Sequence, residues 1–318
     1  MADDQPSFPD FPPPLVAYHG EQPEAPDWFK AAIAQEPERG FITVKGARIE
    51  LLTWGQRGKP GLLLIHGNTA HADWWSFVAP ILAEDYRVAA VSLSGMGASD
   101  WRDAYDFETY AEEARAGAQA AGLYDDGQKP IYVGHSFGGA NVFYSATRHA
   151  DWMKAAILVD TGFGGPPPAA EGFKAPELRN KPNRVYATLA DALARFRLMP
   201  PQSCRNTYIA DFIARRSLKP APLEGGGEGW TWRFDPLLWN KLDRAALGSL
   251  SAPDGPRAPM VHIYGENSAI IRRFSSEADR RVPADVPSFA VPDSEHHIMI
   301  DQPLALITAL RGLLVNWP

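Results

Sequence analysis

The chain has 318 residues, of which 45% are hydrophobic and 22% are charged, as in an ordinary globular protein. These proportions exclude a disordered chain, and the one cysteine, Cys204, excludes an intrachain disulfide framework. The net charge of −7 argues against general nucleic-acid binding, which needs clustered lysine and arginine.

Residues 1–26 are rich in proline and predict an extended arm, either loose or wrapped on the surface. This stretch has neither the basic start nor the apolar core of a secretory signal. No run of 18 apolar residues predicts a membrane span, and the lone cysteine fits a reducing compartment. We therefore expect a cytoplasmic protein.

Strand and helix patterns alternate along most of the chain. Strands are expected at 41–44, 48–55, 61–67, 87–95, 130–135, 154–162, 258–265 and 287–293. Helices are expected at 72–85, 107–122, 140–150, 270–281 and 302–317. This alternation predicts an α/β fold with a mostly parallel twisted sheet and helices on both faces.

The alternation stops between residues 162 and 257, where prolines, the run GGGEG at 225–229 and a helical piece at 185–198 occur. About 95 residues are too many for a plain loop. We expect a mainly helical cap inserted between two strands of the sheet. The predicted core is then residues 27–161 and 258–318, and the cap, or lid, is residues 162–257.

The sharpest motif is Gly134-His135-Ser136-Phe137-Gly138-Gly139, which fits G-x-S-x-G. A strand pattern precedes it and a helix pattern follows, which is the context of a nucleophile elbow. The tight turn would lift the Ser136 hydroxyl out of the sheet and aim the Phe137 N–H at what the serine attacks.

Further motifs occur in a matching order. His66-Gly67-Asn68 closes the third strand, Gly95-Met96-Gly97-Ala98-Ser99-Asp100 follows the fourth, and His296 precedes Asp301-Gln302-Pro303. With the Ser136 motif, they make residues 40–318 resemble the α/β-hydrolase fold superfamily, and its cap-bearing serine esterase-like branch. One departure is that Ser92 and Ser94 stand where the family often has Asp and Arg.

The resemblance implies a serine nucleophile, Ser136, activated by a histidine base near the C-terminus. His296 and His297 are the candidates, and the family's spacing from the histidine to a following acid and proline, here Asp301 and Pro303, favours His296. The acid that orients the histidine is ambiguous. The family's usual position falls on Ser268, which has no carboxylate. Asp160, at the end of the preceding strand, is favoured, with Glu266 as the alternative.

The resemblance assigns the oxyanion hole to the backbone N–H groups of Asn68 and Phe137. Asn68 also stands where halide-binding members carry asparagine. Those members and the epoxide hydrolases use an aspartate nucleophile, whereas a serine at position 136 would form a stable ether on displacing halide. Dehalogenase and epoxide hydrolase activity are therefore not expected.

Substrate-pocket candidates are mainly aromatic residues of the cap and of the loop after Asn68. They are His66, Trp74, Trp75, His135, Phe163, Trp230, Trp232 and Trp239. Nine basic and two acidic residues lie between Arg179 and Lys219. A solvated surface or the contact of a homodimer is the plain interpretation, and attraction of an anionic substrate or surface is the alternative.

The sequence predicts a serine hydrolase that cleaves a carboxylic ester, a lactone or a related acyl bond of a small, largely apolar molecule. The alternatives are a carbon–carbon bond hydrolase or cofactor-free perhydrolase on the same three residues, and a non-catalytic small-molecule receptor. No H-E-x-x-H, C-x-x-C, phosphate-loop or dinucleotide pattern occurs, so neither a metal nor a cofactor is expected.

Overall fold

The computed structural model describes residues 11–162, 182–243, 257–273 and 285–317. In this part of the chain, an eight-stranded sheet has the order β1-β2-β4-β3-β5-β6-β9-β10. Its strands are β1 (Glu38–Val44), β2 (Ala47–Trp54), β3 (Gly61–Ile65), β4 (Arg87–Ser92), β5 (Ile131–His135), β6 (Ala155–Val159), β9 (Met260–Gly265) and β10 (Ser288–Val291). β2 is antiparallel to β1 and β4, and the remaining pairs are parallel. The expected mostly parallel sheet is confirmed.

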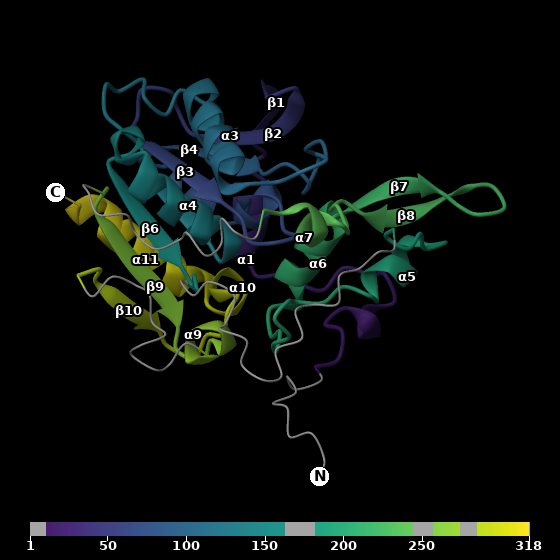
Figure 1. Cartoon of the computed structure of the whole chain (residues 1–318). Helices are drawn as coiled ribbons and strands as arrows, with labels where there is room; N and C mark the ends of the chain where they lie inside the picture. Colours follow the sequence, from purple (N-terminus) through teal and green to yellow (C-terminus); the bar gives the residue numbers. More distant parts are fainter. Residues whose placement is uncertain (1–10, 163–181, 244–256, 274–284, 318) are drawn as a thin grey trace, which may run out of the picture.

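Helices cover both faces of this sheet, because side chains of a strand point alternately to either side. In β3, Leu62 and Leu64 join one hydrophobic cluster, whereas Leu63 and Ile65 join the other. The first cluster includes residues of α1 (Asp27–Ile33), α2 (Ala79–Leu82) and α11 (Pro303–Asn316). The second includes residues of α3 (Phe107–Ala120) and α4 (Phe137–Arg148), which lie side by side in Figure 1.

Two expected helices differ from the observed elements. The stretch 72–85 forms a short 3₁₀ helix, Ala72–Trp75, followed by α2, instead of one helix. Pro80 explains the break, because its ring would clash with the carbonyl four residues earlier in a continuous helix. The helix expected over 270–281 begins as α9 (Ala269–Arg273), and residues 274–284 lie outside the described residues.

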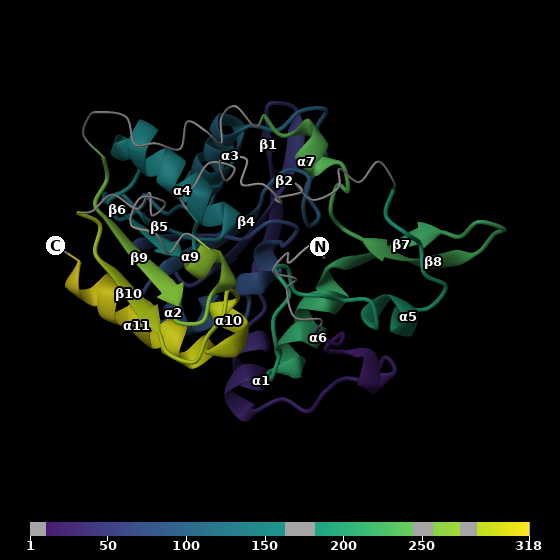
Figure 2. The ribbon, with the colours of Figure 1, turned by 60° about the horizontal axis from the view of Figure 1, so that its bottom comes forward.

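The insertion between β6 and β9 contains α5 (Leu189–Leu193), α6 (Thr207–Arg216) and α7 (Leu238–Lys241) in its described part. It also contains an antiparallel pair, β7 (Leu218–Pro222) and β8 (Glu228–Trp232), which the prediction of a mainly helical cap did not include. The first three residues of the Gly-rich run at 225–229 lie in the turn of this hairpin, and Glu228 and Gly229 begin β8. Gly225, Gly226 and Gly227 have φ values of 95°, 102° and 91°, which glycine adopts readily. Figure 2 shows the hairpin extending away from the sheet.

The described part of the N-terminal arm lies against the insertion rather than loose. Leu15 is buried in the first hydrophobic cluster, and a 3₁₀ helix follows at Val16–Tyr18. The Tyr18 hydroxyl is 2.8 Å from the Thr207 hydroxyl, and Arg215 donates a hydrogen bond to the Gly20 carbonyl. Among the described helices, none is long and apolar enough to cross a bilayer.

Candidate active site

Ser136 stands on a sharp turn between β5 and α4, at the carboxyl end of the parallel strand β5. Its backbone has φ 52° and ψ −115°, a conformation that costs free energy for any residue with a side chain. The Ser136 N–H donates to the Val159 carbonyl across 2.9 Å, which fastens the turn to β6. The expected strand–turn–helix context of Ser136 is therefore present.

The glycines around Ser136 are required by close approach of backbones. A Cβ on Gly134 would stand 2.3 Å from the Gly138 carbonyl oxygen. A Cβ on Gly138 would stand 2.3 Å from the His66 carbonyl oxygen, in the loop that follows β3. Both distances are far below van der Waals contact, so larger residues would push the turn away from its neighbours.

Three side chains from distant segments form a hydrogen-bonded series. His296 Nε2 is 2.9 Å from Ser136 Oγ, and His296 Nδ1 is 2.8 Å from Asp160 Oδ1. The side chains of His296 and Asp160 are buried, with 3% and 0% exposed. The structure thus brings together the three residues that the sequence favoured.

The hydrogen-bond partners of Asp160 determine which ring nitrogen of His296 carries the proton. Its Oδ2 accepts a hydrogen bond from the Gly265 N–H at 2.7 Å, and its Oδ1 accepts one from Ser268 Oγ at 2.6 Å. A carboxylate that already accepts two hydrogen bonds acts as an acceptor for His296 as well. Nδ1 of His296 therefore carries the proton, and Nε2 is free to accept the hydroxyl proton of Ser136.

Glu266, the alternative acid, faces a different turn. Its carboxylate accepts a hydrogen bond from the Asp293 N–H at 3.1 Å, and its own N–H donates to the Val291 carbonyl. Because Asp160 occupies Nδ1 of His296, the geometry favours Asp160 over Glu266.

Two other histidines, His135 and His297, lie beside His296, and each has a ring nitrogen with a hydrogen-bond partner other than Ser136. His135 Nε2 is 3.0 Å from the His296 carbonyl oxygen, so this nitrogen donates a hydrogen bond. The bond helps to hold the loop of residues 292–297, which carries His296 and is called the histidine loop below. His297 Nδ1 is 2.6 Å from Gln202 Oε1. Burial, together with the neighbouring His296 ring, holds the pKa of both histidines well below the ordinary value.

His66 connects the loop after β3 to the end of β4. One ring nitrogen, Nδ1, is 2.7 Å from the Gly67 carbonyl oxygen, and the other accepts from the Leu93 N–H at 3.0 Å. Burial lowers its pKa to about 3, so the ring is neutral at ordinary pH. His66 therefore orders the loop that carries Asn68.

The proposed oxyanion residues lie on two segments that meet beside Ser136. A Cβ on Gly67 would stand 3.4 Å from the Ser136 Cβ, which places the Asn68 loop next to the serine. Phe137 is the first residue of α4, where helix N–H groups have no partner within the helix. Among the described residues, Asn68 Oδ1 is buried without a hydrogen-bond partner.

The aromatic pocket candidates occupy different places. Trp239 of α7 lies edge-on to Phe137, with ring centres 6.0 Å apart, and Trp74 lies 5.6 Å from the His297 ring. Trp75 is fully buried in the first hydrophobic cluster. Trp230 and Trp232, on β8, are partly buried against that same cluster, and Phe163 lies outside the described residues. Trp74 and Trp239 thus contact residues beside His296 and Ser136, respectively.

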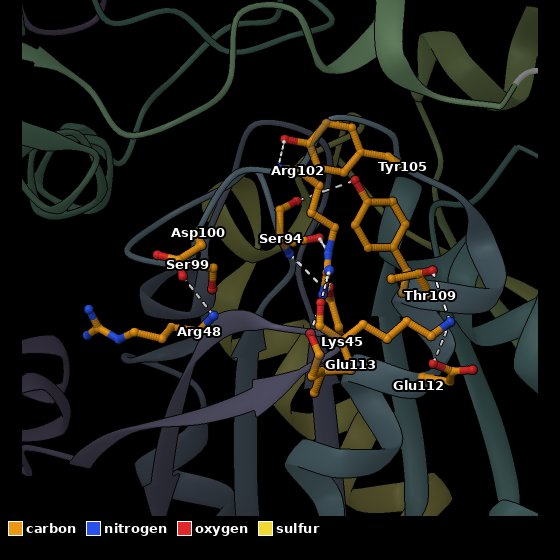
Figure 3. A network of polar contacts seen from close by, with 12 residues as sticks. Lys45, Arg48, Ser94, Ser99, Asp100, Arg102, Tyr105, Thr109, Glu112 and Glu113 are labelled. Atoms are coloured by element: carbon orange, nitrogen blue, oxygen red, sulfur yellow. Dashed lines mark hydrogen bonds and ion pairs between the residues drawn. The ribbon is translucent and has the colours of Figure 1, made fainter.

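A buried ion pair holds the loop that follows β4 (Figure 3). Arg102 donates to Glu113 Oε1 and to the Ser94 hydroxyl, and the Ser94 N–H donates to Glu113 Oε2. Burial raises the pKa of Glu113. Ser92, where the family often has aspartate, donates its hydroxyl to Glu50 at 2.6 Å. The departure at these serines therefore changes local hydrogen bonding and leaves Ser136 untouched.

Several basic residues of the insertion pair within the chain. Arg205 contacts Asp293, Arg216 contacts Asp73, and Lys219 lies over the Trp101 ring. Arg179 and Lys181 lie outside the described residues. These pairs account for part of the positive charge of the segment, and a homodimer formed through it stays a prediction.

Comparison with known proteins identifies the fold family. The family model for the alpha/beta hydrolase family matches residues 62–309. This chain belongs to the alpha/beta hydrolase family. The thioesterase domain from the curacin biosynthetic pathway has the same fold, with a TM-score of 0.65 and 23% identity over 88% of this chain and 99% of that one.

The curated relatives include several proteins that are esterases by name. The bifunctional esterase/perhydrolase DCH of Acinetobacter calcoaceticus is 33% identical over 125 residues, which are 38% of this hydrolase-family chain and 44% of the relative. Esterase Rv0045c of Mycobacterium tuberculosis is 26% identical over 289 residues, which are 85% of this chain and 88% of the relative. The chain therefore spans less than half of the first relative and most of the second.

Sequence reasoning missed two polar residues that contact the Ser136–His296–Asp160 series or its neighbours. Ser268 has no carboxylate and so is not a candidate acid, yet its hydroxyl donates a hydrogen bond to Asp160. The sequence does hold a signal for Ser268. Its hydroxyl stands at the family's acid position, which places it within reach of Asp160, the carboxylate that contacts His296. Gln202 contacts the histidine loop from the insertion, and no local motif marks it.

Proposed function

We propose that this chain is a serine hydrolase that cleaves a carboxylic ester, or a related acyl bond, of a small and largely apolar substrate. The single observation that carries the proposal is the hydrogen-bonded series from Ser136 Oγ to His296 to Asp160, on a turn with strained backbone. The names of the esterase from Mycobacterium tuberculosis and of the esterase/perhydrolase from Acinetobacter calcoaceticus support the same class of reaction.

In the first half of the reaction, Ser136 Oγ forms a bond to the carbonyl carbon of the ester. His296 Nε2 takes the hydroxyl proton, and the Asp160 carboxylate stabilises the imidazolium that results. The backbone N–H groups of Asn68 and Phe137 donate to the developing oxyanion. The bond to the alcohol oxygen then breaks, and the alcohol leaves with the proton from His296.

In the second half, water attacks the acyl group on Ser136. His296 removes a proton from the water and returns it to Ser136 Oγ as the acyl bond breaks. The products are a carboxylic acid and the free enzyme. Trp239 beside Phe137, and Trp74 beside His297, support an apolar substrate at this place.

The proposal is tested with Ser136→Ala and p-nitrophenyl acetate. We expect loss of turnover and of labelling by a fluorophosphonate probe, with an unchanged melting temperature. Wild-type protein that neither turns over esters nor reacts with the probe would favour the non-catalytic receptor. Turnover retained by Ser136→Ala would move the nucleophile to another residue.

Perhydrolysis is a second candidate, because one relative is a bifunctional esterase/perhydrolase. Hydrogen peroxide would then replace water in the attack on the acyl-Ser136, and a peracid would leave instead of the acid. Incubation with acetate and hydrogen peroxide, followed by a peracid assay, separates the two reactions. A carbon–carbon bond hydrolase would instead act on a diketone.

A further inference from the structure

The loop that carries His296 is held from the insertion by a buried amide, Gln202. This residue lies between α5 and α6. Its side chain contacts His297, the last residue of the loop, and Asp301, the last residue of the short helix α10 (Ile298–Asp301) that follows. Its Nε2 donates to both carboxylate oxygens of Asp301, each at 2.9 Å. Its Oε1 accepts from the His297 N–H at 2.9 Å and faces His297 Nδ1 at 2.6 Å.

These partners determine the orientation of the amide. The His297 backbone N–H can only donate, so the oxygen of Gln202 faces it, and the NH₂ group faces the Asp301 carboxyl. Since Oε1 can only accept, Nδ1 of His297 carries its ring proton. One side chain therefore fixes both the backbone and the tautomer of the residue next to His296.

Residues beside Gln202 hold the same loop. The Ser203 hydroxyl and N–H both donate to Glu295, the residue that precedes His296. Asn206 donates to the carbonyls of Ile300 and Asp301. The loop is therefore fastened to the insertion on both sides of His296, while the His296 side chain reaches Ser136 and Asp160 in the core.

We propose that Gln202 is a positioning residue, which holds His296 in register with Ser136 and Asp160 through its contacts with His297 and Asp301. This inference rests on the proposed function. It means that the insertion sets the geometry of the base, in addition to any contact with substrate. A displacement of about 1 Å at a reacting group lowers the rate by about 100-fold.

The electrostatic setting makes the amide difficult to replace. Asp301 and His297 face the Gln202 amide, and Glu295, Arg205 and Cys204 lie near the Asp301 carboxyl. Burial raises the pKa of Asp301 to about 7. The residues that line a neighbouring cavity of about 240 Å³ include Asp301 itself, Glu295 and Arg205. A second carboxyl at position 202 would therefore share a proton with Asp301.

The test uses Gln202→Leu and Gln202→Glu, with Asn183→Leu as the matched control. Asn183 is another amide of the insertion, and it donates to the carbonyls of Trp232 and Phe234. We expect Gln202→Leu to lower kcat for p-nitrophenyl acetate by about 10- to 100-fold with little change in KM. We expect Asn183→Leu to lower the melting temperature without this loss of kcat.

Gln202→Glu supplies a readout that a merely structural role would not move. When protonated, the new carboxyl can donate to Asp301 and accept from His297, as the amide does. When both carboxyls are ionised, they repel each other. We expect near wild-type kcat at low pH and a descending limb near neutral pH, which the wild type lacks. A folded Gln202→Glu protein with the wild-type pH profile would overturn the proposal.

A measurement without substrate separates this proposal from the proposed function. We expect the proton that His296 Nδ1 donates to Asp160 to give a far-downfield NMR resonance, and Asp160→Asn identifies this resonance by removing it. We expect Gln202→Leu to weaken or shift this resonance and Asn183→Leu to leave it in place. An unchanged resonance in folded Gln202→Leu refutes the positioning role. Wild-type protein that shows the resonance yet hydrolyses no ester refutes only the esterase.

Discussion

Ser268 donates its hydroxyl proton to Asp160 Oδ1 across 2.6 Å, and both side chains are fully buried. Ser268 occupies the position at which the resemblance expects the acid. Asp160, on the adjacent strand end, supplies the carboxylate instead, and Ser268 becomes one of its donors. Asp160 thus supplies the carboxylate that contacts His296, and Ser268, 108 residues later in the sequence, supplies a hydrogen bond that holds this carboxylate.

Asp160→Asn is expected to lower kcat for p-nitrophenyl esters by about two to four orders of magnitude, because the amide no longer holds His296 in the active tautomer. Glu266→Gln is the control, since Glu266 accepts from the Asp293 N–H and lies away from His296 Nδ1. Steady-state kinetics of the two proteins decide the matter. The reverse ranking would move the acid to Glu266.

Ser268→Ala is expected to lower kcat by about tenfold, because a hydrogen bond to a charged group contributes about 1.5–3 kcal/mol. Without this bond, Asp160 is held by the Gly265 N–H and His296. Ser294→Ala is the matched control, since Ser294 is equally buried and donates to the Val291 carbonyl. Equal kcat values for the two variants would remove Ser268 from the catalytic arrangement.

Gly138→Ala is expected to destabilise the protein by about 2–3 kcal/mol, because its Cβ would overlap the His66 and Ile65 carbonyl oxygens. Ester turnover should fall as well, since the turn at Ser136 would shift. Gly312→Ala is the control: this exposed helical glycine has open space around it, and alanine should stabilise the helix by about 0.5–1 kcal/mol. Urea denaturation of both variants gives the comparison, and equal stabilities would contradict the packing argument.

His66 is expected to make stability depend on pH. Burial lowers its pKa in the folded protein to about 3, whereas the unfolded value is near 6.5. Between these values the unfolded chain binds more protons, so the free energy of unfolding falls as the pH drops from 6.5 toward 3. His66→Gln, which retains an acceptor for the Leu93 N–H, should show a shallower decline. Urea denaturation between pH 4 and pH 7 measures the slopes, and parallel slopes would show that His66 does not contribute.

Most strands of the sheet could be predicted from the sequence, because most of them are short runs of largely apolar residues. The run 61–67 is apolar at every position that becomes β3, and the glycines of the Ser136 turn stand where backbones touch. The insertion was predicted less well. Its β7–β8 pair depends on the register between two segments of five residues, and β7 contains two prolines, Pro220 and Pro222, which are rare in predicted strands.

The motifs in the amino-acid sequence indicated the family, the turn at Ser136 and the chain order of the serine and the late histidine. The packing of the folded chain, in contrast, selects the carboxylate that lies against His296 and the side chain of the insertion that reaches the loop before α10. The physical reason is that Asp160–His296 and Gln202–His297 contacts join segments 136 and 95 residues apart. Residues so distant in sequence meet only through the packing of strands and insertion, which no local pattern of side chains specifies.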